Sequence, residues 1–133
     1  MPDINQQNHK RFSLKDRLKS FSFAFDGLKK LWKEEHNFRI HFFATILVII
    51  AGLIFKISAF EWIAVILSIG LVFVTEIINT SIENLSDFVS PGENEQIKKI
   101  KDISAAGVLI AATTAFIVGV IIFLPKIFRL LFL

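Results

Sequence analysis

Residues 103–125 read ISAAGVLIAATTAFIVGVIIFLP and contain no charged side chain. A helix of this composition has no polar face to turn toward water, so a soluble helical bundle explains it poorly. Its 23 residues are enough to cross a hydrocarbon layer of about 30 Å. The segment therefore predicts a transmembrane helix, which we expect over residues 103–124.

The composition of the whole chain agrees with a membrane protein. Its 133 residues suit a single domain over 1–133. A hydrophobic content of 53% and a mean hydropathy of +0.60 exceed those of most soluble domains of this size. The chain has no cysteine, which excludes disulfide bonds and thiolate metal sites. The N-terminal segment lacks an apolar region followed by a small-residue cleavage site, so the sequence predicts no signal peptide.

Two further apolar runs, 40–60 and 62–86, predict two more transmembrane helices, and both contain charge. Lys56 lies near the end of the first run, where its long side chain reaches the membrane interface at little cost. Glu76 is the costlier intrusion, because an ionisable side chain at membrane depth usually has a functional reason. Only a short break separates the two runs, so we expect an antiparallel hairpin.

The N-terminal part of the chain is first polar and then amphipathic. Residues 1–11 predict a tail, whereas residues 12–34 predict a helix whose apolar side chains recur at steps of three and four. These apolar positions are Leu14, Leu18, Phe21, Phe25, Leu28 and Trp32. A basic amphipathic helix before a spanning segment is typical of a helix in the lipid headgroup plane, although a bundle helix with a solvated basic face is the alternative. The net charge of +3 is modest, so we expect no nucleic-acid partner.

The distribution of positive charge predicts the orientation in the membrane. Nine of the 15 Lys and Arg residues lie in the N-terminal part that precedes the first span. Three more lie in a polar loop that we expect over residues 88–101, which begins with the turn signal Ser90-Pro91-Gly92. The opposite side has Lys56, Lys126 and Arg129. By the positive-inside rule, the N-terminus and this loop are cytoplasmic and the C-terminus is outside.

Four polar side chains follow one stripe of the second predicted span, because steps of three and four residues return to the same face of a helix. They are Glu76, Asn79, Glu83 and Asp87, and we call them the polar ridge. Glu76 and Glu83 are about 10 Å apart along the helix axis. We expect Glu76 just inside the inner leaflet and Glu83 at the water boundary. For Asn79 and Asp87, catalysis and helix-to-helix hydrogen bonding are equal alternatives.

Other segments bring charge to the same depth. Glu35 lies in the polar segment before the first span, and Lys101-Asp102 precede the last span. Carboxylates and a lysine at one level suit a catalyst with one lipid substrate and one water-soluble anion. Paired carboxylates hold Mg²⁺ together with substrate phosphates, and a lysine neutralises phosphate as a point charge. Glu76, in the driest place, is suited to accept a proton from an alcohol.

The spacing of these residues resembles that of a known family, the bacterial diacylglycerol kinases, which include the undecaprenol kinases. The resemblance covers about residues 21–123. It is carried by the polar ridge with Lys101-Asp102-xx-Ala105-Ala106 fourteen residues later, and by the block Glu35-x-Asn37-x-Arg39-Ile40-His41 before the first span.

The resemblance implies an all-α membrane protein with three transmembrane helices and an N-terminal amphipathic surface helix, working as a homotrimer. Its active sites would lie at the cytoplasmic face of the bacterial inner membrane and be shared between neighbouring chains. The implied reaction is transfer of the ATP γ-phosphate to a lipid hydroxyl, with Mg²⁺ as cofactor and with ATP and a membrane lipid alcohol as partners. The alcohol is either diacylglycerol or undecaprenol, and the segment from Asn37 to His41 is similar to polyprenol-type members.

The resemblance also implies roles for single residues. Glu76 matches the proton acceptor of the family, and Glu35 and Glu83 match the carboxylates that hold the metal. Nucleotide-binding positions correspond to Lys101 and Asp102, with Gly92-Glu93-Asn94 in the loop that wraps the nucleotide; supporting polar positions correspond to Asn79, Asp87, Asn37 and Arg39. Phe23 stands where the family often has a tyrosine near the nucleotide, and Ala105 replaces a serine of some members.

A non-enzymatic membrane subunit for helix assembly or proton relay is the alternative function. Such a subunit would use Glu76 and Glu83 as buried polar contacts. The pair Lys101-Asp102 at the cytoplasmic level favours the kinase, because helix assembly does not need a lysine that faces phosphate.

Overall fold

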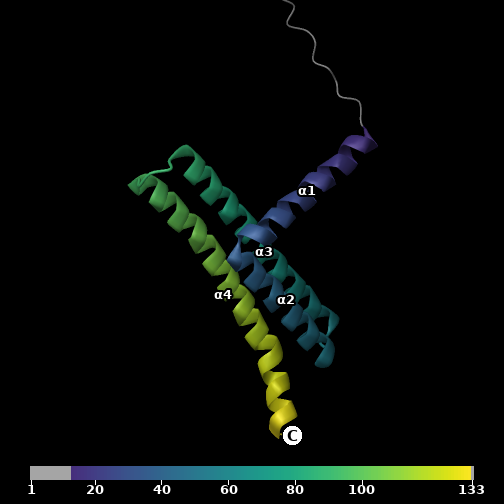
Figure 1. Cartoon of the computed structure of the whole chain (residues 1–133). Coiled ribbons are helices and arrows are strands. Elements are labelled where there is room, and N and C mark those ends of the chain that lie inside the picture. The colour runs from purple at the N-terminus through teal and green to yellow at the C-terminus, as the bar shows by residue number, and fades with distance from the viewer. Residues whose placement is uncertain (1–12, 133) are drawn as a thin grey trace, which may run out of the picture. The chain divides into compact units, whose positions relative to one another are not determined.

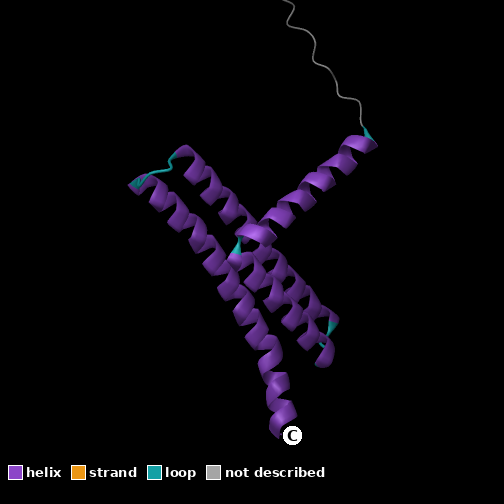
Figure 2. Cartoon of the chain, viewed as in Figure 1, coloured by secondary structure: helices purple, strands orange, loops and turns teal. Residues whose placement is uncertain are grey.

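The computed structural model describes residues 13–132, and these residues form helices and no strand (Figures 1 and 2). In chain order the helices are α1 (Leu14–Glu34), α2 (His36–Ile54), α3 (Ala59–Val89) and α4 (Glu95–Phe132). The predicted all-α fold class is confirmed. The predicted tail over 1–11 lies outside the described residues. The chain divides after Glu34 into two compact units, so α1 is described by itself and α2–α4 together.

Helix α1 has the predicted amphipathic pattern, and its apolar side chains are exposed within its own unit. Leu14, Leu18, Phe21 and Phe25 all have more than half of their surface accessible. Lys33 lies in the last turn, where a positive charge interacts favourably with the helix dipole. A location of α1 in the headgroup plane stays a prediction.

Three helices, α2, α3 and α4, are long and apolar enough to cross a membrane. The first span was expected over 40–60, whereas α2 ends at Ile54; the second was expected over 62–86, which lies within α3. With 31 and 38 residues, α3 and α4 are about 46 and 57 Å long, so both extend beyond a hydrocarbon layer of about 30 Å. The polar ends of these two helices therefore reach the membrane surface or the water beyond it.

The predicted loop over 88–101 is wrong, because only residues 90–94 are non-helical. Asn94 caps α4: its Oδ1 accepts hydrogen bonds from the backbone N–H groups of Gln96, at 2.9 Å, and Ile97, at 3.2 Å. Glu95 in the first turn also suits the positive end of the helix dipole. The charged segment therefore continues α4 toward the water. The transmembrane segment predicted over 103–124 lies within α4, which continues through Pro125.

The predicted hairpin between α2 and α3 is present, with a tight turn at residues 55–58 (Figure 2). Lys56 adopts a positive φ of 48° in this turn. Ser58 and Glu61 form a reciprocal cap: Ser58 N–H donates to Glu61 Oε2 at 2.7 Å, and Glu61 N–H donates to Ser58 Oγ at 3.3 Å. Gly52 is needed on α2, because a Cβ there would lie 2.7 Å from Cη2 of Trp62 on α3.

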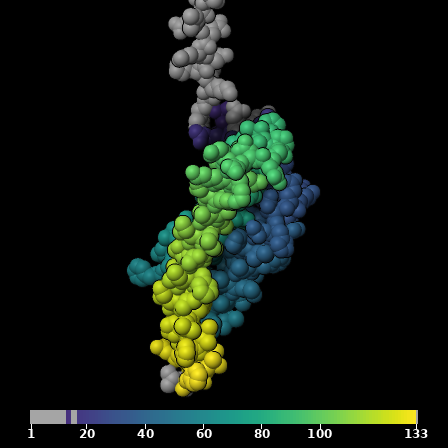
Figure 3. Space-filling view, turned by 90° about the vertical axis from the view of Figure 1, so that its left-hand side faces the viewer, coloured from purple at the N-terminus to yellow at the C-terminus, as the bar shows by residue number. Residues whose placement is uncertain are grey.

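Helices α3 and α4 run antiparallel (Figure 1). An ion pair lies near each end of their contact. Lys101 Nζ is 2.9 Å from Asp87 Oδ1, and Lys126 Nζ is 2.9 Å from Glu61 Oε1. Each step forward along α4 therefore corresponds to one step back along α3. The space-filling view shows α4 along one face with α2 beside it (Figure 3). The buried core of this unit is small, and its centre is Ile57, Val65 and Ile122.

Candidate active site

The polar ridge lies on α3, and its exposure increases along the helix. Glu76 is 2% exposed and Asn79 is 8% exposed, whereas Glu83 is half-buried and Asp87 is exposed. The helical period explains the common face, and the end of the apolar run explains the gradient. The two ends of the ridge therefore differ in water access, as a site that joins a lipid to a soluble substrate requires.

Asn79 is fixed by its neighbour on the ridge. Its Nδ2 donates a hydrogen bond to Glu83 Oε1 at 3.1 Å. Because an ionised carboxylate only accepts hydrogen bonds, the amide must turn its nitrogen toward Glu83. The amide oxygen then points elsewhere, and within residues 13–132 it is buried without a hydrogen-bond partner. An acceptor thus remains available one turn from Glu76.

Glu35 comes to the level of Glu76 from the start of α2. The rings of Phe38 on α2 and Phe73 on α3 pack edge to face with centroids 5.2 Å apart. Helices α2 and α3 run antiparallel. Glu35, which precedes Phe38 by three residues, therefore lies opposite Glu76, which follows Phe73 by three residues. Glu35 occupies the N-cap position of α2, yet its side chain caps no backbone N–H. Its half-buried carboxylate is therefore not used to hold the helix.

Glu35 and His41 on α2 and Glu83 on α3 are close enough to Glu76 to interact with it electrostatically. The three carboxylates predicted from the sequence therefore lie in one region of these two helices. The sequence pattern assigns no role to His41, although an ionisable side chain inside an apolar helix indicates a function.

A polar cavity of about 650 Å³ lies where α3 ends and α4 begins. It brings together all five residues predicted to bind the nucleotide from this part of the chain, namely Gly92, Glu93, Asn94, Lys101 and Asp102. Lys101 pairs with Asp87 here, and Asp102 accepts a hydrogen bond from Lys98 Nζ at 2.6 Å. Both pairs include an exposed side chain and are weak, so breaking either one costs little stability.

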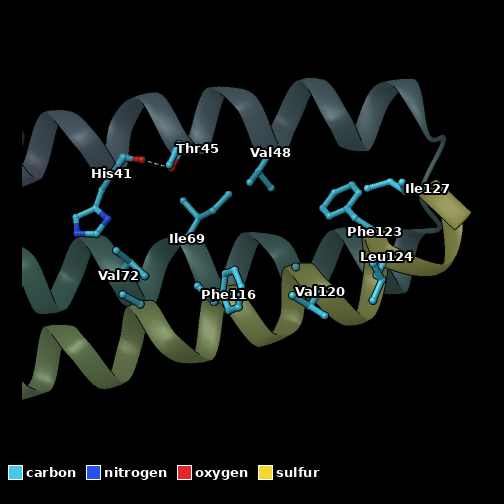
Figure 4. A pocket seen from close by; sticks show the side chains of 14 residues that line it. His41, Thr45, Val48, Ile69, Val72, Phe116, Val120, Phe123, Leu124 and Ile127 are labelled. Carbon is cyan, nitrogen blue, oxygen red and sulfur yellow. Dashed lines mark hydrogen bonds between the residues drawn. The ribbon is translucent and has the colours of Figure 1, made fainter.

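An apolar cavity of about 460 Å³ lies between α2, α3 and α4 (Figure 4). Among its lining residues only His41 and Thr45 have polar side chains, and the Thr45 hydroxyl donates to the His41 carbonyl at 2.8 Å. Figure 4 shows the His41 ring pointing from α2 toward α3, near Val72. Val72 is one turn before Glu76. The apolar cavity therefore ends next to the most buried carboxylate.

Glu35 and the ridge residues Asn79 and Glu83 suit a magnesium–nucleotide complex better than a metal held by protein alone. Within residues 13–132, no three His, Asp or Glu side chains are close enough to form a metal site. Glu35, Glu83 and the free Asn79 oxygen are hard oxygen donors of the type that Mg²⁺ takes when phosphates supply its other ligands. The donor set therefore fits Mg²⁺ that arrives with its nucleotide.

Three other predicted residues lie apart from these contacts. On α2, Asn37 is exposed and Arg39 is half-buried. Phe23 is on α1, in the other unit, where it is 63% exposed and the Lys19 ammonium lies 5.8 Å from the centre of its ring. Their proposed roles stay predictions.

Three membrane-crossing helices, a buried carboxylate at the end of an apolar cavity and a polar cavity that contains Lys98 and Lys101 define the class of protein: an integral membrane enzyme for a lipid and a water-soluble substrate. Residues 22–123 match the family model described as prokaryotic diacylglycerol kinase, and the chain belongs to this family. It is a lipid kinase, a phosphotransferase that acts on an alcohol group, and the non-enzymatic alternative is not favoured.

Named relatives agree with the family. The chain is 34% identical to the undecaprenol kinase of Bacillus subtilis strain 168 over 123 residues, which cover 92% of this chain and 99% of the relative. It is 35% identical to a diacylglycerol kinase of Synechocystis over 86% of this chain and 66% of that protein. It is also 30% identical to the diacylglycerol kinase of Escherichia coli K12 over 75% of this chain and 82% of that protein.

Proposed function

We propose that this chain transfers the γ-phosphoryl group of Mg·ATP to the hydroxyl of a polyprenol such as undecaprenol. The burial of Glu76 at the end of the apolar cavity carries this proposal, because it joins a proton acceptor to a space for a hydrocarbon chain. The polyprenol is favoured over diacylglycerol because the relative named undecaprenol kinase matches over nearly its whole length.

The proposed reaction assigns one task to each region. The hydrocarbon chain lies in the apolar cavity, so that its hydroxyl reaches Glu76. The alcohol oxygen bonds to the γ-phosphorus, the bond from that phosphorus to the bridging oxygen of ADP breaks, and Glu76 takes the alcohol proton.

The nucleotide is proposed to enter through the polar cavity. Its base and ribose lie near residues 92–94, and Lys101 exchanges Asp87 for a phosphate oxygen. Asp87 and Glu76 are about 16 Å apart along α3, so the phosphates must extend along the ridge. Glu35 and Glu83 would hold Mg²⁺, which supplies positive charge for the transferred phosphoryl group.

We also propose a homotrimer in the bacterial inner membrane, with the N-terminus and residues 90–94 on the cytoplasmic side. The positive-inside rule supports the orientation. Many large apolar side chains of α2–α4 are exposed, such as Leu47, Leu67 and Leu109, which suits contact with lipid or with neighbouring copies. In this assembly a neighbouring chain would complete each site.

The direct test incubates the purified protein with radiolabelled ATP, Mg²⁺ and equal amounts of undecaprenol and diacylglycerol. Labelled polyprenyl phosphate is the expected main product, and Glu76→Gln is the matched inactive control. Labelled phosphatidic acid as the main product would contradict the choice of acceptor. No labelled lipid at any Mg²⁺ concentration would contradict the whole proposal.

A further inference from the structure

Ser104 on α4 has a buried hydroxyl oxygen without a hydrogen-bond partner in the described part of the chain. It follows Lys101 by three residues and so lies on the same face of α4. The pair between Lys101 and Asp87 fixes the register of the two helices. In that register, Ser104 lies at the level of Glu83 on α3. Its hydroxyl therefore lies beside the polar ridge.

The other helical hydroxyls in α2–α4 with a hydrogen bond behave differently. Thr45, Thr75, Ser81 and Thr114 each donate to the backbone carbonyl four residues earlier, at 2.8 to 2.9 Å. This bond satisfies a hydroxyl within its own helix, and Ser104 does not make it. An unpaired hydroxyl away from water is costly, so a partner from outside the described chain is expected for Ser104.

The position of Ser104 suggests what that partner is. Lys101 borders the polar cavity, and Ser104 lies about 4.5 Å further from this cavity along α4. On α3, Glu76 lies about 10 Å further from the cavity than Glu83. A phosphate chain that extends from the polar cavity toward Glu76 therefore passes Ser104. Phosphate oxygens need donors, and the ionised carboxylates of the ridge can only accept.

We propose that Ser104 is a further nucleotide-binding residue, whose hydroxyl donates a hydrogen bond to a γ-phosphate oxygen. The proposal rests on the proposed function, since it requires a nucleotide triphosphate along the ridge. Helix α4 then supplies two donors one turn apart, Lys101 and Ser104, while α3 supplies the acceptors. No bond breaks at Ser104, and its role is to bind and orient.

The test measures equilibrium binding of two magnesium complexes, one of a non-hydrolysable ATP analogue and one of ADP, to the full-length protein. Ser104→Ala is expected to weaken binding of the analogue by roughly tenfold to one hundredfold, as for a lost hydrogen bond to a charged group, and to leave ADP binding unchanged. Ser104→Thr keeps the hydroxyl and should keep most of the affinity. Ser81→Ala is the matched control, because the Ser81 hydroxyl bonds to its own helix at Ile77.

The outcomes separate this inference from the proposed function. Unchanged analogue binding by Ser104→Ala, with lipid phosphorylation intact, overturns the role of Ser104 and leaves the kinase assignment standing. Equal weakening for the analogue and for ADP indicates a packing role and also overturns it. If Ser104→Ala lowers the melting temperature strongly, Ser104→Cys, similar in size and a weak donor, must give the same selective loss.

Discussion

Replacing Lys101 with glutamine separates its structural role from its proposed role in binding phosphate. Its ammonium is 2.9 Å from Asp87 Oδ1, with the two side chains 34% and 64% exposed. Such a solvent-exposed pair contributes little to the free energy of unfolding. A charge-assisted hydrogen bond to phosphate contributes about 1.5–3 kcal/mol, which is roughly a tenfold to one hundredfold change in affinity. We therefore expect a small loss of stability and a large rise in the KM for Mg·ATP.

The control for this experiment is Lys98→Gln. Lys98 borders the same cavity and pairs with Asp102 at 2.6 Å, with the side chains 76% and 63% exposed, so its loss should cost as little stability. Thermal unfolding and steady-state kinetics on both variants give the comparison. If Lys101→Gln unfolds the protein, or if Lys98→Gln raises the KM as much, the assignment of Lys101 to phosphate is refuted.

Three further predictions concern the frame around the site. Gly52→Ala should lower the free energy of unfolding by about 1–3 kcal/mol, because its Cβ would lie 2.7 Å from the Trp62 ring; unchanged thermal unfolding would contradict this contact. Ala115→Phe fills part of the apolar cavity and should raise the KM for the lipid while the KM for Mg·ATP stays constant; the reverse pattern would exclude a hydrocarbon chain there. Lys126→Met removes the ion pair with Glu61, about 22 Å along α3 from the ridge, and should lower the melting temperature only slightly without changing kcat; a large fall in kcat would contradict this.

The spans and the ridge were predictable from the sequence because their signals are local. An uncharged segment of membrane length and polar residues at steps of three and four need no tertiary information. The same reasoning failed at residues 95–101, where charge was taken to indicate a loop. A single cap at Asn94 and a helix that continues into water explain the error.

The details of the site depend on partners that a sequence pattern does not contain. Glu35 lies opposite Glu76 because Phe38 on α2 packs against Phe73 on α3. The pairing of Lys101 with Asp87, fourteen residues away on α3, likewise depends on how two helices pack. Ser104 had no signal at all, because its importance lies in a hydrogen bond that its helix does not make.

The central claim is that Glu76 takes the proton of the lipid alcohol, and Glu76→Gln tests it most directly. The amide has nearly the same shape but cannot accept this proton as a base. General base catalysis contributes typically 10²–10⁴-fold, so lipid phosphorylation should fall by about that factor, while binding of the magnesium complex of a non-hydrolysable ATP analogue stays at the wild-type value. A variant that phosphorylates lipid at the wild-type rate would contradict the account.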